Sequence, residues 1–182
     1  MREYVADIPA EWLESGPIEI FHSASILATF MPGTAKVVRF VGPHTFYRAA
    51  GWSSGKGQWA SAYGSWWADS FALVEIGKRI DKFEDWLPSE LLQRAWPAQF
   101  RGAAALCEDW NDMREMFRLE LPSEHELIGL VGLATPQPQV SAMDAREAKT
   151  PMLVGGGEQV YFKQTPTLNS VNPLWVYAAH LW

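Results

Sequence analysis

The sequence has one cysteine, no long apolar run and no surplus of basic residues. A single cysteine cannot form an internal disulfide, and Cys107 follows the apolar residues 103–106, so we interpret it as a buried structural thiol and not a nucleophile. Histidine and cysteine do not cluster at the spacing of a metal site, so we expect no metal. No apolar segment reaches the roughly 20 residues of a membrane-spanning helix, so we expect no membrane partner.

The N-terminal residues and the charge balance restrict location and partners. Residues 1–12 contain no apolar stretch of the kind that a signal peptide has. We therefore expect a cytoplasmic site of action, which a delivered effector could also reach. The 21 acidic and 15 basic residues give a formal net charge of −6. This balance argues against a protein that binds nucleic-acid phosphates along a basic face, but it is compatible with a small anion held by individual arginines.

Aromatic side chains are what the chain has in quantity, with 10 Trp, 5 Tyr and 9 Phe among its 182 residues. Such side chains supply large buried area, and their flat faces can also form the walls of a ligand site. The length fits a single domain with a sizeable core.

The pattern of apolar residues predicts one α+β domain over residues 1–182, with helices in the middle of the chain and a strand-rich second half. The expected strands are 18–22, 34–41, 44–49, 117–121, 127–133, 159–163 and 174–179. The expected helices are 9–14, 69–80 with Asp69 as its N-cap, 89–95 and 103–116. Residues 51–57, rich in Gly and Ser, predict a loop, and the polar residues 134–151 predict an ordered loop or a lid.

Arg48 is the first candidate site residue. It lies in the predicted strand 44–49, where alternation places it on the same face as Phe46. An arginine in an apolar strand is costly unless its guanidinium meets solvent or an anion, and its planar fork suits phosphate. The backbone amides of the loop 51–57 could help to hold a pyrophosphate. The alternative is an edge-strand arginine paired with a surface acid.

The adjacent Trp66 and Trp67, which follow Ser65, form the second candidate. In a strand, neighbouring side chains point to opposite faces, so one ring would face the core and the other could be free for a ligand. The alternative is that both tryptophans are core residues.

The third candidate is the Glu158-Gln159 pair, which follows three glycines and opens a predicted strand. Glycine lets the backbone approach a ligand closely or turn sharply. A carboxylate at this point could stabilise an oxocarbenium ion or activate a hydroxyl, whereas Gln159 could only hydrogen-bond. The alternative is a hairpin turn with an incidental polar pair.

Taken in order, these three segments resemble the three-part layout of ADP-ribosyltransferase toxins. Residues 110–111, 127–137 and 153–161 are also similar to the toxin tips of Rhs-type and other polymorphic bacterial toxins. The resemblance implies an ADP-ribosyltransferase-like split β-sandwich that uses NAD as its substrate. It further implies transfer of ADP-ribose to a macromolecular acceptor, and a cognate immunity protein as a partner.

Carried onto this chain, the resemblance implies a catalytic set and a set that binds NAD. The catalytic set is Arg48, Glu158 and Gln159. The NAD-binding set is Tyr47, Arg48, Ser65, Trp66, Trp67, Gly156 and Gly157. One departure matters: the position directly before the strand residues, where the family has Glu, is Gln159 here, and a shift of one residue points to the opposite face. Hydrolysis of NAD, an unusual acceptor or lost catalysis therefore stay open.

Two other functions stay open as well. The chain resembles RES-type toxins more loosely, in which a Tyr-Arg, a helical Glu and a Ser act on NAD with phosphate; here these would be Tyr47-Arg48, Glu75 and Ser141. Glu75 can equally pair with Lys78 on a solvated helix face. A non-enzymatic binding module with aromatic anchors is the third interpretation. Convergence of Arg48, Trp66 and Glu158 on one pocket would favour an enzyme, and their separation onto different surfaces would count against it. None of the four histidines is predicted to be catalytic.

Overall fold

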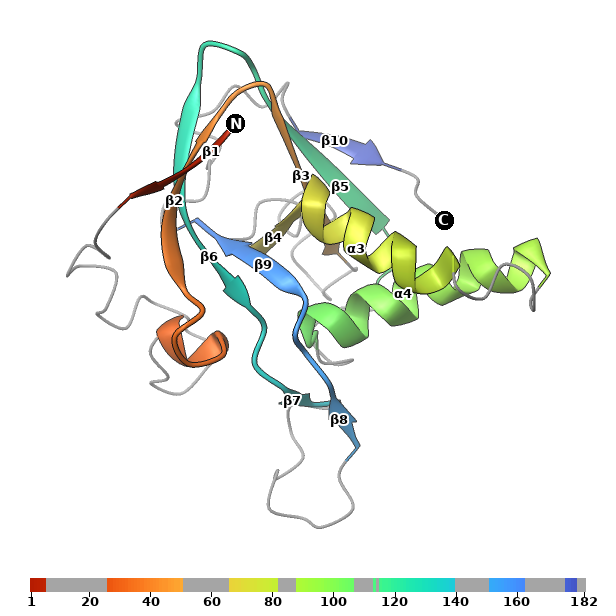
Figure 1. Cartoon of the computed structure of the whole chain (residues 1–182). Coiled ribbons are helices and arrows are strands. Elements are labelled where there is room, and N and C mark those ends of the chain that lie inside the picture. The colour runs from red at the N-terminus through yellow and green to blue at the C-terminus, as the bar shows by residue number, and fades with distance from the viewer. Residues whose placement is uncertain are drawn as a thin grey trace, which may run out of the picture.

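An antiparallel sheet of eight strands organises the chain, and two helices cover part of it (Figure 1). The computed structural model describes residues 1–5, 26–50, 66–81, 88–106, 113, 115–139, 151–162 and 176–179. The strand order is β1-β2-β6-β9-β4-β3-β5-β10.

The bounds of the elements follow from the described residues. The strands of the large sheet are β1 Arg2–Val5, β2 Lys36–Val41, β3 His44–Ala50, β4 Trp66–Asp69, β5 Glu115–Leu121, β6 Glu126–Leu133, β9 Glu158–Tyr161 and β10 Val176–Ala179. A separate short ribbon pairs β7 Gln137–Pro138 with β8 Met152–Leu153. The helices are the 3₁₀ turn η1 Ile26–Thr29, α3 Ser70–Asp81 and α4 Ser89–Ala104.

The sheet is strongly curved, and its concave side, here called the inner face, is a core of its own. Three strands separate β2 from β3 in the sheet order, yet the rings of Phe40 and Phe46 lie edge to face with centroids 4.8 Å apart. The Phe162 ring contacts both of them. In Figure 1 the connections from β2 to β3 and from β5 to β6 pass over the same end of the sheet. The two ends of the sheet thus face each other across a shared aromatic core.

The opposite, outer face is covered by the helical elements. Small residues on β3, β4 and α3 allow the helices to lie close to the strands, and larger side chains fill the space between. The residues of this contact are Ala49, Ala68, Ala72, Ile76, Ile80, Phe100, Ala103 and Met116. Beside it, Ile26 of η1 and the following Phe30 pack against Leu130 and Tyr161. Because both faces are buried, β2 carries apolar side chains on both of its sides.

Much of the sequence-based prediction is confirmed. The fold is a single α+β domain with a mostly antiparallel sheet, and the expected strands 34–41, 44–49, 117–121, 127–133, 159–163 and 174–179 correspond to β2, β3, β5, β6, β9 and β10. Asp69 caps α3 as expected, since its Oδ1 accepts hydrogen bonds from Phe71 N at 3.0 Å and Ala72 N at 3.1 Å. The expected segments 9–14, 18–22 and 51–57 lie outside the described residues, as do residues 140–150 of the expected loop 134–151.

The helix predicted for 103–116 is wrong, and so is the predicted end of the preceding helix at residue 95. One helix, α4, runs from Ser89 through Pro97 to Ala104, and residues 115–116 already belong to β5. Ala105 adopts a left-handed conformation with φ 50°, which ends α4. The last carbonyls of α4 are taken by the glycines before β9, because Gly155 N and Gly157 N donate to Gly102 O and Ala103 O.

This close approach predicts a selective effect of adding one methyl group. A Cβ on Gly157 would lie 2.7 Å from both the Cβ and the carbonyl oxygen of Ala103, whereas a Cβ on Gly102 would meet nothing within 4 Å. Gly157→Ala should therefore lower the free energy of unfolding by about 1–3 kcal/mol. Gly102→Ala, inside α4, should raise it by about 0.5–1 kcal/mol. Urea unfolding measures both, and equal stability of Gly157→Ala and wild type would contradict the contact.

Candidate functional site

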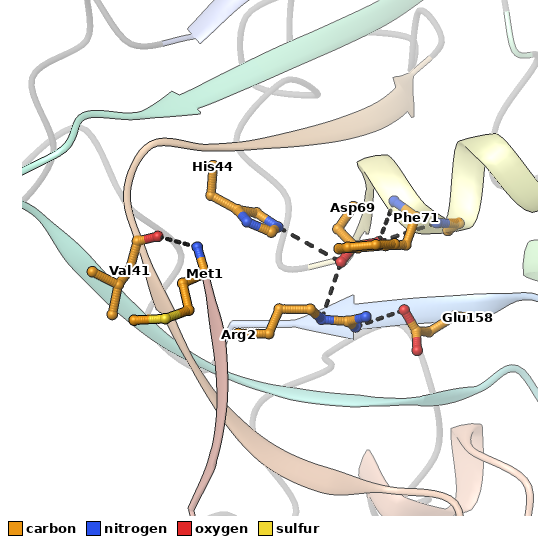
Figure 2. A network of polar contacts seen from close by, with 8 residues as sticks. Met1, Arg2, Val41, His44, Asp69, Phe71 and Glu158 are labelled. Atoms are coloured by element: carbon orange, nitrogen blue, oxygen red, sulfur yellow. Dashed lines mark hydrogen bonds and ion pairs between the residues drawn. The ribbon is translucent and has the colours of Figure 1, made fainter.

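Four ionisable side chains from four strands meet on the inner face (Figure 2). They are Arg2 of β1, His44 of β3, Asp69 of β4 and Glu158 of β9, and we refer to them as the inner charge cluster. Their meeting follows from the sheet. Because β4 runs antiparallel to both β3 and β9, the last residue of β4 lies beside the first residues of its two neighbours.

The guanidinium of Arg2 bridges the two carboxylates of the cluster. Its Nε lies 3.2 Å from Asp69 Oδ2, and its Nη2 donates a hydrogen bond to Glu158 Oε1 at 2.6 Å. The guanidinium carbon also lies over the rings of Phe40 and Phe71, at 5.7 and 5.3 Å from their centroids. Charge and ring contacts together fix this side chain between β4 and β9.

Asp69 is fully buried and serves two roles at once. Its Oδ1 caps α3, while its Oδ2 faces Arg2 and, at 3.6 Å, His44 Nε2. Burial opposes ionisation and is the largest single influence on this carboxyl. The contacts with His44, Arg2 and the N–H of Ala72 nevertheless outweigh it and hold the pKa of Asp69 below its usual value. Asp69 is therefore a buried carboxylate at neutral pH.

The three buried polar atoms at the centre of the cluster compensate one another. Arg2 Nε and His44 Nε2 both lie at ion-pair distance from Asp69 Oδ2, although none of these contacts has hydrogen-bond geometry. Buried polar atoms are nearly always hydrogen-bonded in native proteins, so this point is the most polar part of the inner face.

A cavity of about 520 Å³ adjoins the cluster, a size suited to a small molecule. Its walls combine cationic groups, hydroxyls and an aromatic ring. They are formed by Met1, Arg2, Pro43, His44, Thr45, Ser70 and Phe71. The Phe71 side chain is 57% exposed, so its ring is accessible from solvent.

Arg48 also lies on the inner face, as alternation predicts. Its Nη1 donates to the main-chain oxygen of Trp66 at 2.7 Å, so it links β3 to β4. Burial removes water from the guanidinium and lowers the pKa of Arg48 to about 10. The side chain thus remains charged at neutral pH in a poorly solvated place. Its neighbour Tyr47 faces outward and packs against the helices.

Trp66 and Trp67 point to opposite faces, as predicted for a strand. Trp67 is buried in the inner core. The ring of Trp66 faces outward, where its centroid lies 5.5 Å from that of Phe30 and 4.8 Å from that of Tyr161. Ser65 lies outside the described residues.

Glu158 and Gln159 diverge in the same way. Glu158 is half-buried on the inner face beside Arg2, whereas Gln159 is buried on the outer face and donates from Nε2 to Thr29 O at 3.1 Å. The amides of Gly156 and Gly157 donate to Ala134 O and Ala103 O. These two glycines therefore connect β9 to β6 and α4 through hydrogen bonds within the chain.

The structure thus brings some predicted residues together and separates others. Arg48 and Glu158 share the inner face, but Trp66 contributes only its main chain there, and none of the three lines the cavity beside the cluster. Glu75 is exposed on α3 and bonds Lys78 Nζ at 2.6 Å, as expected for a solvated helix face. Ser141 lies outside the described residues.

Sequence reasoning missed most of the charge cluster. Asp69 was expected only to cap α3, and no role was expected for Arg2 or His44. One signal was available: alternation along 44–49 places His44 on the same face as Phe46 and Arg48. That face pattern marks His44 as inward-pointing, but the partners from β1 and β9 depend on strand pairing that the sequence does not give.

Comparison with family models, curated proteins and solved structures found no match to this chain. Among the described residues, no three or more His, Cys, Asp or Glu side chains gather as a metal site would require. The described helices are all too short or too polar to cross a membrane. The geometry of the inner face is therefore the basis for any functional conclusion.

Arg2 should be a major determinant of stability. Arg2→Ala would leave Asp69 buried without its guanidinium partner, and removing one member of a buried ion pair typically costs about 3–5 kcal/mol. Arg39→Ala is the matched control, since Arg39 pairs with Glu3 on an exposed part of the neighbouring strand and should change stability far less. Urea unfolding compares the two, and equal losses would contradict the bridging role of Arg2.

The depressed pKa of Asp69 predicts a pH dependence of stability. A carboxyl whose pKa is lower in the folded state stabilises the fold above its unfolded pKa of about 3.9, and this contribution is lost as pH falls through the folded pKa. Wild type should therefore lose more stability between pH 6 and 2 than Asp69→Asn does. Unfolding at a series of pH values measures this, with Glu124→Gln on the exposed β5–β6 turn as control. Parallel curves for wild type and Asp69→Asn would exclude the effect.

Proposed function

We propose that this chain is an NAD-consuming enzyme of the ADP-ribosyltransferase type, which cleaves the nicotinamide–ribose bond and transfers ADP-ribose to a macromolecular acceptor. One observation carries the proposal. The strands β3, β4 and β9 are neighbours in the sheet and carry Arg48, the Trp66-Trp67 pair and Glu158. Arg48 and Glu158 lie on the same inner face.

The shape of the sheet supports an ADP-ribosyltransferase-like split β-sandwich. The connection from β2 to β3 crosses between the two ends of the sheet, and Phe40 and Phe46 pack against each other across the concave side. The two described helices, α3 and α4, pack on the outer face.

The proposed chemistry needs a carboxylate near the ribose and a cation near the pyrophosphate. Breaking the nicotinamide–ribose bond produces a cationic, oxocarbenium-like ribose, which a nearby carboxylate stabilises. Glu158 would supply that carboxylate, since its side chain is 29% exposed and is held in place by its ion pair with Arg2. Arg48 would attract the pyrophosphate of NAD, because its charge lies in a poorly solvated place where an anion is strongly favoured.

Hydrolysis of NAD is the second candidate, and the orientation of Gln159 favours it. In the resembled family the catalytic acid stands where this chain has Gln159, and that side chain bonds Thr29 O on the outer face. Glu158 would then act alone on the ribose, and water would be the acceptor. An immunity protein would be a partner of either activity.

The proposal is tested by nicotinamide release from NAD by purified protein, with and without cell lysate as a source of acceptors. Glu158→Gln should lower kcat by about 100-fold with little change in KM, because it removes charge that acts mainly in the transition state. Arg48→Ala and Arg48→Lys should raise KM by weakening the hold on the pyrophosphate.

Glu75→Gln is the matched control, since Glu75 is an exposed carboxylate outside the inner face and its loss should leave the rate unchanged. A loss of activity in Glu75→Gln, with phosphate required for turnover, would instead favour the RES-type reaction. No nicotinamide release by wild type, even with lysate, would overturn the proposal and favour the binding module.

A further inference from the structure

We infer that His44, supported by Asp69, is a general base that deprotonates an oxygen nucleophile bound in the cavity beside the inner charge cluster. The nucleophile is water or a hydroxyl group of the acceptor. The inference rests on the proposed function, because it describes how the second substrate of that reaction is activated.

The contact between His44 and Asp69 indicates which ring nitrogen of His44 can accept a proton. His44 Nε2 lies 3.6 Å from Asp69 Oδ2, and Asp69 is ionised at neutral pH. A carboxylate at that position favours the tautomer with the proton on Nε2, which leaves the lone pair on Nδ1. The side chain of His44 is only 6% exposed, but it forms part of the cavity wall. The ring is therefore buried against its carboxylate and reachable from the cavity.

The carboxylate beside the ring gives an imidazolium a partner during the reaction. Two carboxylates, Asp69 from β4 and Glu158 from β9, share a single guanidinium, that of Arg2 from β1. In a histidine–carboxylate pair the carboxylate orients the imidazole and stabilises the imidazolium that forms when the ring takes a proton. The amino group of Met1, also at the cavity, is engaged with Val41 O at 2.7 Å.

The other residues around the cavity leave room for an oxygen nucleophile beside His44. Among the described residues, Thr45, Ser70 and Phe71 line it together with Arg2. Water or a hydroxyl group needs a base, because its proton has to leave as the new bond forms, and a neutral imidazole can take that proton.

The step balances without any further reagent. The bond between ribose C1′ and the nicotinamide nitrogen breaks, and its electron pair leaves with neutral nicotinamide. A lone pair of the acceptor oxygen forms the new bond to C1′. The proton of that oxygen passes to His44 Nδ1, and the imidazolium, held by Asp69, later releases it to solvent. The products are nicotinamide, an O-linked ADP-ribose or free ADP-ribose, and one proton.

The test uses the full chain and measures nicotinamide release against pH. His44→Gln should lower kcat by about 100-fold or more with KM for NAD within about twofold. The loss of rate at acidic pH that a general base predicts for wild type should be absent from this variant. Asp69→Asn, which keeps an oxygen to cap α3, should also lower kcat. His125→Gln makes the same change at an exposed histidine of the β5–β6 turn and should behave as wild type. Added imidazole should restore part of the activity of His44→Ala.

Each outcome decides one question. If wild type releases nicotinamide and His44→Gln keeps its kcat and acidic limb, the role of His44 is overturned while the proposed function stands. If wild type releases none, both fall. If the His44 variants do not fold, the imidazole tautomer of the wild-type protein decides, by long-range ¹H–¹⁵N NMR at neutral pH. A proton on Nε2 supports the inference, and a proton on Nδ1 overturns it.

Discussion

The buried carboxylate of Asp69 is the point on which the rest of the structure depends. One of its oxygens caps α3, and the other faces Arg2 of β1 and His44 of β3. Since Asp69 is the last residue of β4 and the residue before α3, the outer helical layer and the inner charge cluster share a single side chain. A buried charge is tolerated only where neighbours compensate it, so Arg2 has to be in place for the inner face to form.

The pairing of β4 with both neighbours then determines which side chains can work together. Antiparallel pairing on each side sets the end of β4 beside the beginnings of β3 and β9, which brings His44 and Glu158 to the same inner face. It also turns Trp66 and Gln159 outward, where they contact Phe30 and Thr29 respectively. A shift of one residue in β9 would exchange Glu158 for Gln159 at the cluster and remove its second carboxylate. Register therefore decides the chemistry available on this face.

The cluster and the cavity suggest a division of labour for the proposed reaction. In that proposal, Arg48 would hold the pyrophosphate of NAD and Glu158, within the cluster, would act at its ribose, while His44 would serve the acceptor from the cavity. Arg2 belongs to both parts, because it holds Glu158 in place and also forms part of the cavity wall. Two substrates would thus meet at a single guanidinium.

The sequence by itself determined the class of fold, most strands of the second half, the cap of α3, and the opposed directions of the two tryptophans, because these follow from local periodicity and short-range hydrogen bonds. It placed Arg48 in a strand and Glu158 at the opening of another, but it did not predict which side chains would lie beside them. It misjudged residues 103–116, where the end of α4 is fixed by glycines about fifty residues later in the chain. Only the tertiary structure decided that Arg2, His44, Asp69 and Glu158 form one charged set, since contacts between residues so far apart in the chain depend on strand order and register.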